Sequence, residues 1–145
     1  MNAIQLRKRL GIGFTGAAVV SLLAFSGAAF GEDVKVTLSG DQEVPAVKTS
    51  ASGSGTITVN PDKSVSGSVT TTGVAGTAAH IHDAATGKNG PVIVPLTKSG
   101  ENMWSVPAGA KLTDAQYKEF KSGNLYVNVH SAANKGGEIR GQLKP

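Results

Sequence analysis

Three histidines are the residues of this chain whose type and spacing suit metal chemistry: His80 and His82 in an H-x-H pair, and His130 later in the chain. There is no cysteine, so thiolate zinc sites, iron–sulfur clusters and a cysteine nucleophile are excluded. Side chains at i and i+2 of a strand share one face, roughly 7 Å apart at Cα. Two such imidazoles can bind one ion, and a third from a neighbouring strand would leave an open coordination position.

The histidines are out of phase with the apolar residues of their own segments. The apolar residues that alternate with them are Ala79, Ile81, Leu125, Val127 and Val129. His130 instead shares its face with Tyr126 and Asn128, since strand side chains alternate between faces. A histidine packed in the core would be in phase with its apolar neighbours, so the pattern favours a ligand role. The alternatives are solvated surface histidines, or a hydrogen-bonded group that only orders loops.

The donor set favours copper of the type-2 kind, with zinc as the second choice, because neutral imidazole suits both ions. Asp83 follows His82 but points to the apolar face by strict alternation, so it binds only if the strand ends before it. Met103 is an alternative soft axial ligand, although methionine more often fills gaps in a core. The fourth ligand stays open between water, Met103 and a carboxylate.

The last two strand-like segments predict groups that orient the histidines. The polar residues 131–137 join them as a hairpin, in a register that places Glu138 opposite His130. Two residues along, Asn128 faces Arg140. Glu138 would then accept the second imidazole N–H of His130, which is how metal-bound histidines are commonly held. The alternative is a cross-strand charged pair on a solvated face.

Residues 1–31 have the layout of a secretory signal peptide. Arg7, Lys8 and Arg9 precede an apolar stretch over 10–25, which is shorter than the roughly 20 residues of a membrane-spanning helix. Small residues then lead to a cleavage site near Gly31. We therefore expect a bacterial protein exported to the periplasm or the medium, the alternative being an uncleaved N-terminal anchor.

Removal of this leader changes the overall charge. The whole chain carries 14 basic and 10 acidic residues, a net charge of +4, and three of the basic ones lie in the leader. The sequence pI of about 9.5 therefore belongs to the precursor. No basic stripe remains to indicate nucleic-acid binding, and no second apolar span follows to indicate a membrane partner.

Residues 32–145 predict a single all-β domain. Alternating segments separated by Gly, Pro, Asn and Asp give about eight short strands, typical of a sandwich or barrel. They cover residues 34–38, 56–59, 65–71, 79–83, 92–97, 103–106, 125–130 and 138–143. The Ser- and Gly-rich stretch 50–55 is expected to be a loop. A capping box of Thr113 and Gln116 predicts one short helix over 114–122.

Several motifs resemble those of the CHRD domain, a module named after chordin and common in short bacterial secreted proteins. They are SGDQEVP at 39–45, AHIHD at 79–83, GPVIVPL at 90–96 and GNLYVNVHSAANKGGEIRGQL at 123–143. The resemblance implies an immunoglobulin-like or Greek-key β-sandwich. It maps the family's histidines onto His80, His82 and His130. Members usually have glycine after H-x-H, where this chain has Asp83, so the turn there is expected to differ.

Two functions of different classes follow from these observations. The first is an exported protein that binds one copper ion, in metal handling or in redox chemistry with a small oxygen species. An open coordination position permits catalysis without demonstrating it, so enzymatic activity is left open. The second is a non-enzymatic extracellular interaction module without metal, whose strands or loops bind a protein partner. A homodimer is a further arrangement that the sequence allows without positive evidence.

Overall fold

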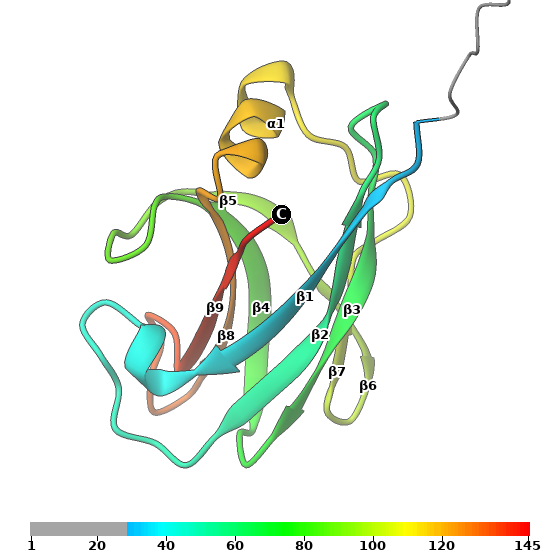
Figure 1. The fold of residues 1–145 in the computed structure, drawn as a ribbon. Coiled ribbons are helices and arrows are strands. Elements are labelled where there is room, and N and C mark those ends of the chain that lie inside the picture. Colours follow the sequence, from blue (N-terminus) through cyan, green and yellow to red (C-terminus); the bar gives the residue numbers. More distant parts are fainter. Residues whose placement is uncertain (1–28) are drawn as a thin grey trace, which may run out of the picture.

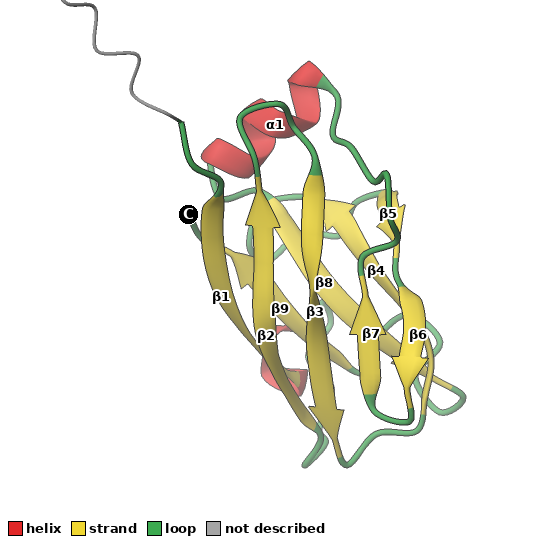
Figure 2. Ribbon diagram, turned by 90° about the vertical axis from the view of Figure 1, so that its right-hand side faces the viewer, coloured by secondary structure: helices red, strands yellow, loops and turns green. Residues whose placement is uncertain are grey.

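Nine antiparallel strands and one α-helix make up the computed structural model, which describes residues 29–145. The strands form one continuous sheet in the order β5-β4-β8-β9-β1-β2-β3-β7-β6. This sheet folds over into two facing layers, seen edge-on in Figure 1 and with one layer in front of the other in Figure 2. The expected all-β class is therefore confirmed. The predicted leader lies outside the described residues except for its last three positions.

The strands are β1 (Glu32–Ser39), β2 (Ser52–Val59), β3 (Val65–Thr72), β4 (Gly76–Asp83), β5 (Val92–Pro95), β6 (Thr97–Gly100), β7 (Met103–Ser105), β8 (Leu125–Ser131) and β9 (Ile139–Leu143). A 3-10 turn, η1 (Gly40–Gln42), follows β1. One layer contains β5, β4, β8 and β9, and the other contains β1, β2, β3, β7 and β6 (Figure 2). The layers join where Ser39 of β1 pairs with Arg140 of β9.

The hydrophobic core lies between the two layers. Each strand supplies its inward-facing apolar residues, as period-two alternation requires. In β8, Leu125, Val127 and Val129 are at most 1% exposed. Trp104 of β7 is also a core residue, with 4% of its surface exposed.

The helix α1 (Asp114–Lys121) covers one end of the layered sheet (Figure 1). Its predicted capping box is confirmed, because Thr113 accepts from the Gln116 amide and the Gln116 side chain accepts from the Thr113 amide. Phe120 is fully buried and joins the helix to the core. The helix brings no chemistry to the histidine strands.

Most of the predicted strands are present with ends shifted by a few residues, and two segments differ more. The segment 92–97 is divided at Leu96, because the chain leaves the edge of one layer as β5 and enters the edge of the other as β6. Residues 52–55 are strand rather than loop. A Cβ atom on Gly55 would lie 2.0 Å from the carbonyl oxygen of Ser68, so glycine there allows the close approach of β2 and β3.

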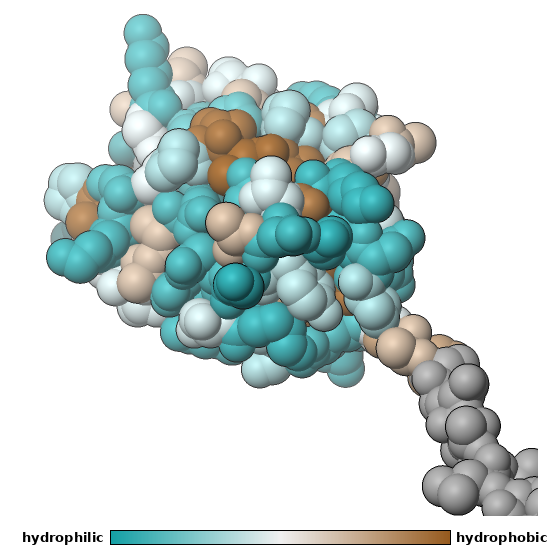
Figure 3. All heavy atoms as spheres, turned by 90° about the horizontal axis from the view of Figure 1, so that it is seen from above, coloured by the Kyte–Doolittle hydropathy of each residue, from teal (hydrophilic) through white to brown (hydrophobic). Residues whose placement is uncertain are grey.

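Seen from the end that carries α1, the surface is mostly hydrophilic with one small group of hydrophobic atoms at its centre (Figure 3). Large apolar side chains that are well exposed are few: Phe30, Val92 and Met103. Within residues 29–145, no helix has the length and apolar character needed to cross a membrane.

Candidate metal centre

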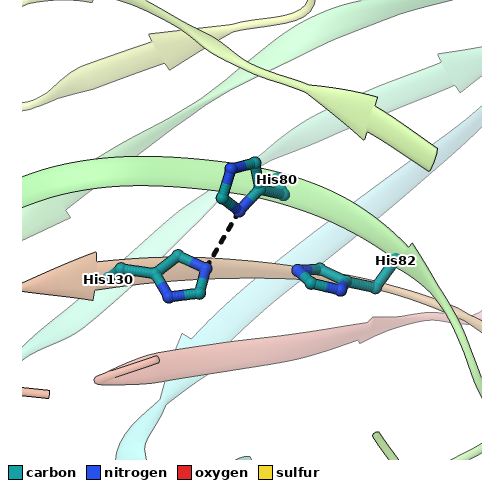
Figure 4. A group of neighbouring side chains, drawn as sticks. All are labelled: His80, His82 and His130. Atoms are coloured by element: carbon teal, nitrogen blue, oxygen red, sulfur yellow. Dashed lines mark hydrogen bonds between the residues drawn. The ribbon is translucent and has the colours of Figure 1, made fainter. Parts of the chain in front are cut away.

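The three histidines meet on the outer face of the layer formed by β4 and β8. His80 and His82 come from β4 and His130 from the neighbouring β8, and the three rings point toward one another (Figure 4). One nitrogen from each ring can be chosen so that all three lie within 4.8 Å of one another. The ring of His130 lies 4.8 Å from that of His80 and 6.2 Å from that of His82, between centroids. The structure thus brings the predicted residues together.

Two of the three rings have a fixed protonation pattern. Nδ1 of His82 lies 2.9 Å from the carbonyl oxygen of Gly90, and Nδ1 of His130 lies 2.8 Å from that of Lys135. A carbonyl oxygen only accepts, so both Nδ1 atoms carry the proton and both Nε2 atoms hold a lone pair in the neutral rings. Two lone pairs are therefore aimed into the centre of the cluster.

His80 differs from the other two rings, because its hydrogen bond goes to a histidine and not to a backbone carbonyl oxygen. Its Nδ1 lies 2.9 Å from Nε2 of His130, and because that Nε2 is unprotonated, His80 donates this hydrogen bond. A metal ion bound between the rings would replace the shared proton. The His80 proton would then sit on Nε2, so that Nδ1 becomes a ligand atom. The separation of 2.9 Å is already close to the ~3 Å between two nitrogens on one ion.

The lone pair on Nε2 of His82 is buried and lacks a hydrogen-bond partner among residues 29–145. His82 is only 8% exposed. A buried acceptor without a donor costs about 1–3 kcal/mol. Chelation by this atom would remove that cost. The donor set thus fits a cation that prefers imidazole nitrogen.

Burial favours the neutral form of two of the rings, His80 and His82. Burial lowers the pKa of His80, and the neighbouring His130 and His82 lower it further. Burial also lowers the pKa of His82, against the opposite effect of the Gly90 carbonyl oxygen and the nearby Asn128 side chain, which both favour the protonated ring. Only the neutral ring is a ligand. Burial therefore reduces the competition between protons and a metal ion at His80 and His82.

Asn128 and Arg140 lie on the same outer face as the histidines, and both are buried. The register of that pair is as predicted, and the two side chains are 2% and 1% exposed. Loops lie over them. The Arg140 guanidinium donates to the backbone oxygens of Lys88 and Ala85, at 2.8 and 3.2 Å. The 84–91 loop is thereby held onto the outer face of the sheet.

Three planar groups stack in a column that fixes His82. The His82 ring lies parallel to the Tyr126 ring at a centroid distance of 4.8 Å and an angle of 5°. The Arg140 guanidinium carbon lies 3.5 Å from the centroid of the same Tyr126 ring. Gly90 links the column to the loop, since its amide donates to the Tyr126 hydroxyl and its carbonyl accepts from His82. The His82 ring is therefore rigidly held.

The predicted partner of His130 is wrong. Glu138 accepts a hydrogen bond from Thr49 at 2.8 Å, and hydrogen bonds from Ser131 and Thr49 lower the pKa of its carboxyl group. The backbone oxygen of Lys135 takes the expected role instead. The reason is that β9 begins at Ile139, so Glu138 belongs to the loop and turns away from the strand.

Neither Asp83 nor Met103 joins the cluster. Asp83 is the last residue of β4, and burial followed by the charge of Glu119 raises its pKa, which places it toward α1. Met103 lies on β7, which pairs with β3 and β6 and not with the histidine strands, and it is 40% exposed. The group of histidine and carboxylate ligands found in residues 29–145 consists of the three histidines alone.

Sequence reasoning missed Glu43, which lies beneath Gly137 beside Asn128. A Cβ atom on Gly137 would lie 2.4 Å from Oε1 of Glu43 and 2.6 Å from Nδ2 of Asn128. Gly137 has a φ of +128°, and it admits the carboxyl group. Glu43 is 6% exposed. No local pattern identifies this residue, because it reaches the site from the loop after β1.

Glu43 gives the protein a pH-dependent stability. Burial raises its pKa to about 7, against the lowering effect of Arg140 and Asn128. Since the folded pKa exceeds the unfolded one, the stabilisation is complete below pH 4.5 and is lost as the pH rises to 7. Glu43→Gln keeps a neutral side chain at every pH. Its free energy of unfolding relative to the wild type should therefore increase from pH 4.5 to 7.

Urea denaturation of metal-free protein at several pH values measures this difference. The shifts of His80 and His82 are present in both proteins and cancel in the comparison. A constant difference between the two proteins across this range would show that Glu43 is ionised throughout.

One side of the cluster is open. A hollow of about 480 Å³ borders His80 and His130, and its other walls are mostly small side chains. They are Thr77, Ala78, Ser131, Ala132 and the longer Lys135. His82 is not among the lining residues. The cluster thus has a buried end at His82 and an accessible end at His80 and His130.

The model of the CHRD domain matches residues 34–143. This is most of the chain and includes all nine strands except the first two residues of β1. The chain therefore belongs to the CHRD domain family, as the sequence motifs indicated. Among curated proteins and among solved structures, no match was found.

Proposed function

We propose that this protein is an exported metal-binding protein in which His80, His82 and His130 hold one Cu(II) ion. The observation that carries this proposal is the convergence of three imidazole nitrogens within 4.8 Å, one of them a buried lone pair without a donor. Each ring has a separate means of support. His82 and His130 are held by carbonyl oxygens, and His80 lies against His130.

Copper is favoured over zinc on two grounds. Nitrogen sites bind Cu(II) more tightly than Zn(II) in the general order of divalent metals. Type-2 copper also accepts three imidazoles with an open position, and the hollow beside His80 and His130 gives small molecules access to it. The function would be metal handling, or redox chemistry with a small oxygen species at that position. Export rests on the signal-like residues 1–31.

Titration of chelator-treated protein with Cu(II) and with Zn(II), each buffered by a competing ligand, tests the proposal. We expect one equivalent of either ion, with Cu(II) bound more tightly. Bound metal should also raise the free energy of unfolding, by about 2.7 kcal/mol at 100 times the Kd. Failure to bind either ion above the level of weak, multiple surface sites would contradict it and leave an extracellular interaction module as the function.

A further inference from the structure

The side chain of Asn128 occupies the inner corner of the histidine cluster. It stands directly opposite His80 in the β4–β8 register, and it is two residues before His130 on the same face of β8. His82 lies diagonally across, opposite Tyr126. All four side chains therefore project from one patch of sheet. With 2% exposure, Asn128 is more deeply buried than any of the histidines.

The orientation of the Asn128 amide is determined by its surroundings. Nδ2 lies 3.4 Å from the carbonyl oxygen of Gly136, and it adjoins the carboxyl group of Glu43 below Gly137. The Gly136 carbonyl oxygen can only accept a hydrogen bond, so the NH2 group belongs on that side. Oδ1 must then face the opposite side, where the histidines lie.

Two buried acceptors thus remain without donors at the inner end of the cluster. Oδ1 of Asn128 and Nε2 of His82 are both solvent-inaccessible, and neither finds a hydrogen-bond partner in the part of the chain that the structure describes. The His82 ring cannot turn to supply a proton, because its Nδ1–H is used by Gly90 and its face is stacked on Tyr126. Two buried acceptors without donors are costly, whereas a cation between them satisfies both.

We propose that Oδ1 of Asn128 is the fourth ligand of the metal ion, which makes the site three nitrogens and one oxygen. This inference rests on the proposed function. The amide oxygen closes the buried side of the ion, so the exchangeable position faces the hollow beside His80 and His130. Because amide oxygen is a hard ligand, Asn128 favours a divalent ion over Cu(I). Glu43 and Gly136 are then positioning groups, which keep the oxygen turned inward.

Electron spin resonance of the wild-type protein with ¹³C in the side-chain carbonyl of asparagine tests this ligand directly. With one equivalent of Cu(II), we expect hyperfine coupling to three imidazole nitrogens and to one ¹³C nucleus, the latter lost in Asn128→Leu. Imidazole coupling without any ¹³C coupling would overturn the Asn128 assignment alone. Absence of the imidazole coupling would instead overturn the proposed function. No substitution is needed for this distinction.

A set of variants provides a second measurement. Asn128→Leu should weaken Cu(II) binding ~10-fold or more and raise the reduction potential of the copper. Asn128→Asp keeps an oxygen donor and should retain tight binding. Asn124→Leu is the matched control, because this half-buried asparagine bonds Glu119 near α1, away from the cluster. If Asn128→Leu folds and keeps both wild-type affinity and potential, Asn128 is not a ligand.

Discussion

Replacing His82 with alanine should weaken Cu(II) binding by ~100-fold or more, since even the outer partners of a metal ligand are worth ~10- to 100-fold. His82 is the most buried and most firmly held of the three rings. Its Nε2 cannot be replaced by a neighbouring side chain of the histidine and carboxylate type, because the cluster within residues 29–145 has no fourth member of that kind. Competition titration of metal-free wild-type and variant proteins measures the change.

Lys135→Ala is the matched control for this experiment. Lys135 holds His130 through its backbone oxygen, which the substitution preserves, so its affinity for Cu(II) should stay within a few-fold of the wild type. His82→Ala should fold, because it also removes a buried acceptor that lacks a donor. Unchanged Cu(II) affinity in a folded His82→Ala protein would exclude His82 as a ligand.

Arg140→Leu should lower the free energy of unfolding by about 3–5 kcal/mol, the scale of breaking a buried charge network. The substitution leaves the carbonyl oxygens of Ala85 and Lys88 without their donor, and it removes the cation that faces Glu43. Release of the 84–91 loop also frees Gly90, so Cu(II) binding should weaken as well. Urea denaturation of the metal-free protein measures the stability.

Two comparisons separate the causes of this loss. Lys98→Leu removes an exposed cation near Trp104 and should cost less than about 1 kcal/mol. Adding Glu43→Gln to Arg140→Leu removes the carboxyl group that has lost its cation, so part of the stability should return. Wild-type stability of Arg140→Leu would show that the guanidinium does not hold the loop.

The position of the histidines could be predicted because strand periodicity is a local property. Alternation with Ala79 and Ile81 placed His80 and His82 on the outer face, and the H-x-H spacing placed them side by side. The hairpin register between Asn128 and Arg140 followed in the same way. The capping box at Thr113 is equally local and predicted α1.

The covering of this face could not be predicted, because it depends on contacts between segments distant in sequence. Glu43 reaches Asn128 from the loop after β1, and Arg140 reaches the 84–91 loop across 52 residues to Lys88. Alternation predicts which face a side chain takes, but it does not tell whether water or a loop lies over that face. Alternation alone therefore does not predict that Asn128 and Arg140 are buried.

The error at Glu138 has the same origin. A shift of one residue in the start of a strand decides whether a side chain belongs to the sheet or to the loop. Here Glu138 belongs to the loop, and the backbone oxygen of Lys135 orients His130. A backbone partner leaves no signature in the sequence, because any residue at position 135 supplies the same carbonyl.

Anomalous diffraction at the copper absorption edge, from crystals of the protein loaded with one equivalent of Cu(II), tests the central claim most directly. We expect a single strong peak in the anomalous difference map, about 2.0–2.1 Å from one nitrogen of each of His80, His82 and His130. A peak elsewhere on the surface, or electron density in which the His80–His130 hydrogen bond persists with no metal beside it, would contradict it.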